Sequence, residues 1–193
     1  LLSSAASDVY KRQALLLIMF TNSNLNSYEE GVAKNNDIEI YYRDYGPVDA
    51  EPILLVQGLG GQLINWPPHL IEFLIENNFR PIVFDNRDTG LSSRINSDSF
   101  SKDKIDNTIV RNYIRYYLRL PIKSEYIIDD MATDAITVLD ALDVDTAHVI
   151  GISMGGMIAQ ILVANYPERV KTFTLIASTA STPSPFNLSL IHI

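Results

Sequence analysis

The chain has 193 residues, of which 47% are hydrophobic and 20% are charged, a composition typical of one globular domain with a substantial core. Its net charge of −8 argues against nucleic acid or an anionic membrane as a partner, because both would repel it. Cysteine is absent, which excludes disulfides, thiolate metal sites and a cysteine nucleophile. No apolar run is long enough to span a bilayer.

Both ends of the sequence differ from the part between them. Residues 1–13 and 187–193 resemble translated linker sequence, so we exclude them from the fold and expect a gene that was cut short. Residues 14–27 begin with a short apolar run and are either the remnant of a secretory signal peptide or a frayed segment. No small-residue cleavage pattern lies nearby, which slightly favours a cytoplasmic protein over an exported one. The expected domain covers residues 28–186.

The domain is predicted to open with two short strands, at 30–33 and 38–45, that form an antiparallel hairpin. The continuous apolar run at 53–56 then predicts a strand buried on both faces of a parallel sheet. It ends at Gly58-Leu59-Gly60-Gly61, and loops at the carboxyl ends of central strands are where α/β sheets form binding sites. A phosphate cradle is disfavoured, because no Gly-Lys-Ser/Thr sequence follows the glycines.

A helix is predicted from about Trp66 to Asn78, followed by a second buried strand at 81–84. His69, in the first turn of that helix, is interpreted as a surface or packing residue. The strand leads into Asp85-Asn86-Arg87-Asp88-Thr89-Gly90-Leu91-Ser92. These charges are typical either of an acid–base or metal cluster, or of a turn whose charged groups pair with one another and with backbone amides. We favour the turn.

Three further elements follow. Residues 109–120 predict an amphipathic helix. Residues 126–142 predict a second helix, capped by Asp129 or Asp130, whose acidic residues form its cap and a solvated face. The apolar, β-rich run at 170–177 predicts a last buried strand.

The most specific motif is Gly151-Ile152-Ser153-Met154-Gly155, a G-x-S-x-G sequence between a strand pattern and a helix pattern. A serine on such a sharp turn is held in a strained conformation, and flanking glycines avoid collisions with the strand and the helix. The turn presents the Ser153 hydroxyl beyond the sheet. It also leaves the N–H of Met154 at a helix N-terminus, where it can stabilise a developing oxyanion. His148 lies too early in the strand to reach that hydroxyl, so we interpret it as a packing residue.

After the hairpin, strands and helices alternate, which predicts an α/β fold with a mostly parallel, right-handed wound sheet. Residues 31–183 resemble the α/β-hydrolase superfamily in the order of their motifs, which are at 53–60, 84–92, 126–142 and 151–156. Within that superfamily the chain is most similar to bacterial carboxylesterases of the aclacinomycin-methylesterase type, which share a similar Asp-x-Arg-Asp-Thr-Gly turn. Compared with that family, the C-terminal strands and the cap are missing, so we expect an incomplete fold.

The resemblance implies that Ser153 is the nucleophile and that the backbone N–H groups of Met154 and Leu59 form the oxyanion hole. It also implies that Gly58 and Leu59 contact the substrate. One departure is that Gln57-Gly58 stands where the family usually has His-Gly. Because the hole uses backbone groups, this difference does not by itself abolish the chemistry.

The second departure concerns the other two members of the family's triad, an acid and a histidine that follow the serine in the chain. After Ser153 the only carboxylate side chain is Glu168 and the only histidine is His192, and neither lies at a matching position. We therefore expect the parent protein to cleave a small carboxylic ester through an acyl-enzyme, without a metal or organic cofactor. We expect this fragment to be inactive or nearly so.

Two alternatives stay open. The same serine turn serves C–C bond hydrolases, lactonases and perhydrolases. The parent could instead be a non-catalytic protein that binds a ligand on a hydrolase scaffold. Haloalkane dehalogenases and epoxide hydrolases are disfavoured, because they have an aspartate where Ser153 stands.

Overall fold

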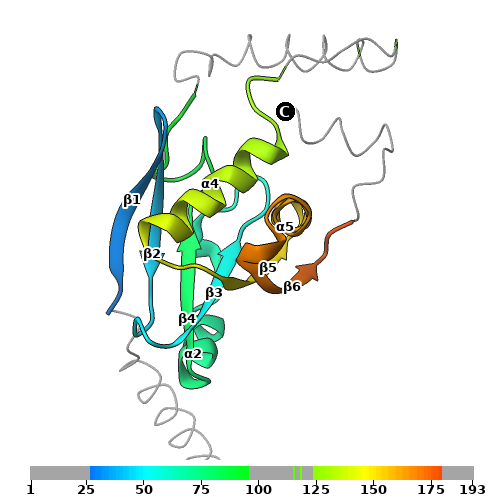
Figure 1. The fold of residues 1–193 in the computed structure, drawn as a ribbon. Helices are drawn as coiled ribbons and strands as arrows, with labels where there is room; N and C mark the ends of the chain where they lie inside the picture. The colour runs from blue at the N-terminus through cyan, green and yellow to red at the C-terminus, as the bar shows by residue number, and fades with distance from the viewer. Residues whose placement is uncertain (1–26, 96–114, 116–117, 119–123, 180–193) are drawn as a thin grey trace, which may run out of the picture.

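A computed structural model describes residues 27–95, 115, 118 and 124–179 (Figure 1). Residues 1–13 and 187–193 lie outside the described part, as do almost all of 14–27 and almost all of the helix predicted at 109–120. Within the described part, six strands form one sheet in the order β1-β2-β4-β3-β5-β6.

The sheet has an antiparallel edge and a parallel centre. β1 pairs antiparallel with β2, and β2 pairs antiparallel with β4, whereas β4, β3, β5 and β6 are parallel to one another. This confirms the predicted α/β class with a leading hairpin. The turn of the hairpin contains Asn36 at φ 55°, a left-handed conformation that asparagine tolerates well. The strand bounds are β1 Glu29–Asn35, β2 Ile38–Asp44, β3 Glu51–Val56, β4 Phe79–Phe84, β5 Ala147–Ile152 and β6 Val170–Ile176.

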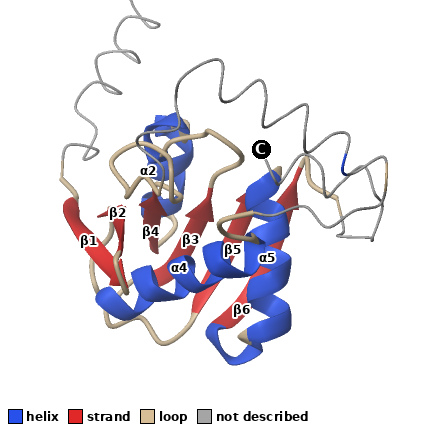
Figure 2. Ribbon diagram, turned by 90° about the horizontal axis from the view of Figure 1, so that it is seen from above, coloured by secondary structure: helices blue, strands red, loops and turns tan. Residues whose placement is uncertain are grey.

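In the part of the chain that the structure describes, three α-helices cover the two faces of the sheet: α2 (Pro68–Glu76), α4 (Ile128–Ala141) and α5 (Met154–Asn165). In Figure 2, α4 and α5 lie on one side of the sheet and α2 lies on the other. Leu54 and Val56 of β3 pack with the core residues of α4 and α5, while Ile53 and Leu55 pack with those of α2. Burial on both faces explains why this strand is a continuous apolar run.

None of the helices in the described part of the chain has the length and apolar content needed to cross a membrane.

The expectation that the acidic residues of α4 form only a cap and a solvated face is wrong for Asp134, which is buried. Its side chain is 1% exposed and forms an ion pair with Arg87, with an Nε–Oδ2 distance of 2.6 Å. A second guanidinium nitrogen lies 2.7 Å from Oδ1, and the Asn35 amide donates to the same carboxylate at 2.8 Å. Burial alone would lower the pKa of Arg87, but its bonds to Asp134 raise it. The arginine therefore joins the turn after β4 to α4, and does not pair within the turn.

The start of α4 also differs from the prediction. The residue at the N-cap position is Ile127, not Asp129 or Asp130. Asp130 lies in the first turn, where its carboxylate accepts a hydrogen bond from the Ile127 N–H at 2.7 Å. A carboxylate at this position satisfies a free amide and interacts favourably with the helix dipole.

β6 forms where a strand was predicted, but it is not buried. Every residue from Lys171 to Ile176 is exposed, including Phe173 at 44% and Ile176 at 40%. In the described part of the chain β6 pairs only with β5, so its outer edge has no partner strand. Its apolar sequence indicates a strand that packs well, but burial also requires elements to cover it.

Replacing Asp134 with asparagine is expected to lower the free energy of unfolding by about 3 kcal/mol, because the Arg87 charge is then left buried without a counter-ion. Urea unfolding followed by circular dichroism measures the loss. Asp140→Asn is the matched control, since Asp140 pairs with Arg169 at 2.6 Å but its side chain is 58% exposed. We expect that control to lose less than about 1 kcal/mol. Equal losses in the two variants would contradict the prediction.

Candidate active site

The candidate site lies at the carboxyl edge of the parallel strands. β4, β3 and β5 are neighbours, and Val56 at the end of β3 is in register with Gly151 near the end of β5. The loop at 57–63, the turn at 85–92 and Ser153 each follow one of these strands. The sheet therefore brings together the three segments that the sequence marked as candidates.

Ser153 lies at the junction of β5 and α5, in a conformation that L-residues rarely adopt. Its φ is 54° and its ψ is −118°. The backbone holds it there: its N–H donates to the Ile176 carbonyl at 2.9 Å, and its carbonyl accepts from the Gly156 N–H at 3.0 Å and from the Ser178 hydroxyl at 2.8 Å. The side chain is exposed and does not cap the helix. A backbone strained by roughly 1–3 kcal/mol thus presents a hydroxyl that is not engaged in capping.

Both glycines of the motif are required, because backbone atoms of other residues lie too close to leave room for a side chain at either position. A Cβ on Gly155 would lie 2.7 Å from the Gln57 carbonyl oxygen and would collide with the carbonyl of Val56. A Cβ on Gly151 would collide with the backbone of Gly155. The first turn of α5 therefore packs directly on the backbone at the ends of β3 and β5, as the spacing of the motif predicted.

Gly58 lies beside the serine, since a Cβ there would be 3.1 Å from Ser153 Cβ and 3.6 Å from Ser153 Oγ. Leu59 follows and is 59% exposed, whereas Met154 is buried at the start of α5. Among the described residues, neither the Leu59 nor the Met154 amide donates a hydrogen bond in the turns and helix caps. Backbone amides without a partner in turns and caps are the kind of donor that an oxyanion hole uses.

The turn after β4 is ordered by hydrogen bonds from backbone amides to Asp85, which agrees with one half of the favoured interpretation, whereas the predicted pairing of charges within the turn is wrong for Arg87. Asp85 Oδ1 accepts from the Leu63 N–H at 2.7 Å, and Oδ2 accepts from the Leu91 N–H at 3.0 Å. The Ser92 hydroxyl donates to the Asp85 carbonyl at 2.6 Å. Gly90 has φ 54°, and a Cβ there would collide with the carboxylate. The turn therefore has a structural role: through Asp85 it fixes the position of the loop at 57–63.

Neither histidine of the described part forms a hydrogen bond with Ser153. His148 lies at the start of β5, at the opposite end from Ser153, where its Nδ1 is 2.7 Å from the Thr172 hydroxyl. Its Nε2 lies 3.5 Å from Glu51, and its ring meets Phe79 edge-on. These contacts confirm the interpretation of His148 as a packing residue. His69 is exposed in the first turn of α2.

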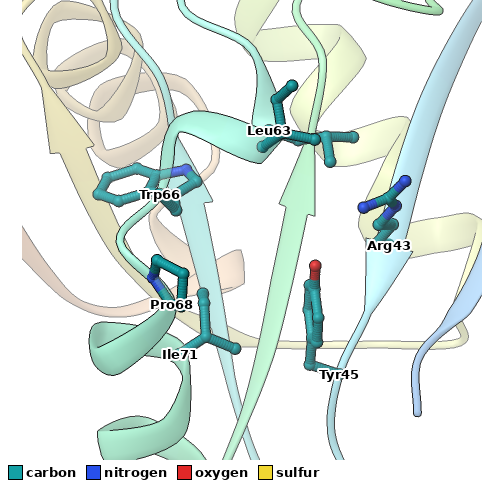
Figure 3. A pocket seen from close by; sticks show the side chains of 7 residues that line it. Arg43, Tyr45, Leu63, Trp66, Pro68 and Ile71 are labelled. Atoms are coloured by element: carbon teal, nitrogen blue, oxygen red, sulfur yellow. The ribbon is translucent and has the colours of Figure 1, made fainter. Parts of the chain in front are cut away.

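A small pocket of about 170 Å³ lies between the end of β2, the segment at 63–66 and the start of α2 (Figure 3). Neither Ser153 nor Leu59 contributes to its wall. In Figure 3 the Tyr45 hydroxyl points up the pocket toward Leu63, with Trp66 and Arg43 on opposite sides. The lining residues are Arg43, Tyr45, Leu63, Ile64, Trp66, Pro68 and Ile71. We do not assign this pocket to the substrate of Ser153.

Comparison with known proteins identifies the family. Residues 51–191 match the family model for the alpha/beta hydrolase fold. The chain belongs to the α/β-hydrolase family, in agreement with its sheet order and its strand–serine–helix junction. It is 32% identical over 162 residues to rhodomycin D methylesterase DauP of Streptomyces sp. strain C5, which confirms the predicted resemblance to the methylesterase type.

Two further similarities also cover most of this chain and less than half of the other protein. The chain is 30% identical over 137 residues to the putative carbamate hydrolase RutD of Variovorax paradoxus, covering 71% of this chain and 41% of that protein. It matches the solved structure of an N-acyl homoserine lactone degrading enzyme with a TM-score of 0.57 and 27% identity, covering 77% of this chain and 45% of that one. The match to DauP covers 84% of this chain and 42% of the relative. The chain thus spans about two-fifths of the length of the curated relatives that it matches.

Replacing Gly155 with alanine is expected to lower the free energy of unfolding by about 3 kcal/mol, because the added methyl group would collide with the backbone carbonyls of Val56 and Gln57. Gly60→Ala is the control. Gly60 has φ 68°, but no atom lies within 4 Å of the position that an added methyl group would take, so only backbone strain of about 1 kcal/mol applies. Urea unfolding of both variants measures the difference. A Gly155→Ala protein as stable as the control would disprove the close approach of α5 to β3.

Proposed function

We propose that the complete protein carrying this sequence is a serine hydrolase that cleaves a small carboxylic ester through an acyl-enzyme on Ser153. The observation that carries the proposal is the backbone of Ser153, which is held at φ 54° at the end of β5 with its hydroxyl beside Gly58. Strain of this kind persists only where the surroundings impose it, and it is concentrated at functional sites. The similarity to a methylesterase and to a putative carbamate hydrolase supports the same chemistry, because both names denote hydrolysis at a carbonyl carbon.

In the proposed reaction, Ser153 Oγ attacks the ester carbonyl carbon, and the carbonyl electrons move onto the oxygen. The N–H groups of Leu59 and Met154 stabilise that oxyanion. Collapse of the intermediate breaks the bond to the alcohol oxygen, and the alcohol leaves with the proton that the serine gave up. Water then attacks the acyl group, one of its protons returns to Ser153 Oγ, and the acid is released.

The base that carries these protons is proposed to come from a part of the complete protein outside the described residues. Within the described part, no histidine hydrogen-bonds to Ser153. Glu168 lies after the far end of α5, in the exposed turn Pro167–Arg169. A histidine oriented by a carboxylate is the arrangement that activates serine in enzymes of this type.

Lactone hydrolysis is the second candidate, and the similarity to an N-acyl homoserine lactone degrading enzyme favours it. A lactone is a cyclic ester, so the same attack by Ser153 opens the ring while the alcohol remains attached to the acyl group. Acid release from a γ-butyrolactone, followed in a pH-stat, distinguishes this activity from hydrolysis of an open-chain p-nitrophenyl ester.

Replacing Ser153 with alanine in the complete protein is expected to lower the turnover of p-nitrophenyl butyrate at least about 10³-fold, because the nucleophile is lost. Covalent labelling by a fluorophosphonate is expected to disappear as well. Ser124→Ala, which changes an exposed hydroxyl before α4, is the control and keeps both properties. Unchanged turnover in the Ser153→Ala protein would refute the proposed function.

The 193-residue chain by itself is expected to hydrolyse the same ester at no more than about 10⁻³ of the rate of the complete protein, because a serine without a base is a poor nucleophile. Release of p-nitrophenol per mole of folded chain measures this rate. A burst of p-nitrophenol equal to the enzyme concentration in the complete protein, and its absence in the chain alone, would be consistent with a catalyst whose base lies elsewhere. A fully active 193-residue chain would contradict this prediction.

A further inference from the structure

We infer that Asn86 is a positioning residue that orients the Leu59 amide toward the oxyanion by holding the carbonyl of Gln57. This inference rests on the proposed ester hydrolysis and adds to it a residue outside the serine motif. Asn86 is the second residue of the turn after β4, and its side chain is buried, with 3% exposure. Its Nδ2 donates a hydrogen bond to the Gln57 carbonyl oxygen at 3.0 Å. Since a carbonyl oxygen can only accept, this bond fixes which end of the Asn86 amide faces Gln57.

The bond acts on the peptide group directly before the proposed oxyanion donor. The Gln57 carbonyl belongs to the rigid peptide plane between Gln57 and Gly58, and the Leu59 N–H belongs to the next plane. That next plane is itself held, because the Gly58 carbonyl accepts from the Gly61 N–H at 3.1 Å. Only the two backbone dihedrals of Gly58 lie between the plane that Asn86 holds and the plane that carries the Leu59 amide.

The same carbonyl is also where the helix that follows Ser153 reaches β3. A Cβ on Gly155 would lie 2.7 Å from the Gln57 carbonyl oxygen, so α5 packs against the group that Asn86 holds. The other end of the loop is held by the neighbouring residue, since Asp85 accepts from the Leu63 N–H at 2.7 Å. Asp85 and Asn86 therefore fix both ends of the loop at 57–63 to the end of β4. A shift of the Gln57 carbonyl changes the position of the Leu59 N–H relative to Ser153 directly.

Stability alone does not explain an asparagine at this position. Asn86 Oδ1 is buried and has no hydrogen-bond partner among the described residues. An unpaired buried acceptor is destabilising, and an apolar side chain would not have one. The property that an apolar residue lacks is the N–H that donates to Gln57.

The test replaces Asn86 with aspartate, which keeps the shape but removes the donor, and separately with alanine, both in the complete protein. We expect kcat per active site, counted with a fluorophosphonate, to fall by about 10- to 100-fold, less than the loss of a whole oxyanion donor. KM is expected to change less than about 3-fold, because the substrate carbonyl carries little charge before attack. The Ki of an alkylboronic acid, which forms a tetrahedral adduct with serine, is expected to rise by the same factor as kcat/KM falls.

Asn65→Asp is the matched control, because it makes the same change of charge in the neighbouring turn. Asn65 uses its Oδ1 to accept from the Gln62 N–H at 2.7 Å, and aspartate keeps that acceptor. We expect its kcat and its boronate Ki to stay within about 2-fold of the wild type, as expected for a surface change without lost contacts.

The outcomes separate this inference from the proposed function. If Ser153→Ala removes activity but folded Asn86→Asp and Asn86→Ala proteins keep the wild-type kcat and boronate Ki, the inference about Asn86 is wrong and the proposed function stands. If neither Asn86 variant folds, Asn86 is a stability residue and the inference is also wrong. If Ser153→Ala keeps its activity, the proposed function fails and the role of Asn86 fails with it.

Discussion

The direct contact between the first turn of α5 and the last carbonyl groups of β3 is the constraint on which the site depends. It is possible only because residue 155 has no side chain, so that the helix can approach the backbone of Val56 and Gln57. This approach brings the end of β3 next to the residue that precedes the helix, which is Ser153. The left-handed backbone of that serine follows from the same geometry, because the chain must reverse from the strand into a helix that lies against the neighbouring strand.

The rest of the described structure keeps that contact in place. The turn after β4 holds the loop at 57–63 through Asp85 and Asn86, and Arg87 of the same turn pairs with Asp134 of α4. Three consecutive residues thus join β4, the loop after β3 and a helix on the opposite face from α2. A buried ion pair of this kind is weak support for stability on its own, since burial of both charges opposes their attraction. Its geometry nevertheless ties the turn to one position on α4, because three side-chain nitrogens converge on one carboxylate.

Local sequence patterns were sufficient to predict the fold class and the sharp strand-to-helix turn at Ser153. The apolar run of β3, the glycines around Ser153 and the strand–helix order each reflect requirements that lie within a few residues of one another. The burial of Asp134 was missed because its partner is 47 residues away, and an acidic residue on a helix is more often solvated. The contact between Asn86 and Gln57 was missed for the same reason, since within a polar turn no sequence signal separates a residue that bonds across the sheet from one that faces water.

β6 shows that an apolar sequence can predict a strand correctly without predicting its burial. Its hydrophobic content predicts a buried strand, and it does pair with β5 from Val170 to Ile176, yet its residues from Lys171 onward are exposed. It is nevertheless part of the site, because the Ile176 carbonyl accepts the N–H of Ser153, and Ser178 just beyond it donates to the Ser153 carbonyl. The strained turn is therefore held on one side by buried β3 and on the other by an edge strand that the described residues leave uncovered. Exposed edge strands open more readily than central ones. Because the Ile176 carbonyl accepts the Ser153 N–H, any opening of this edge strand also loosens the backbone of the candidate nucleophile.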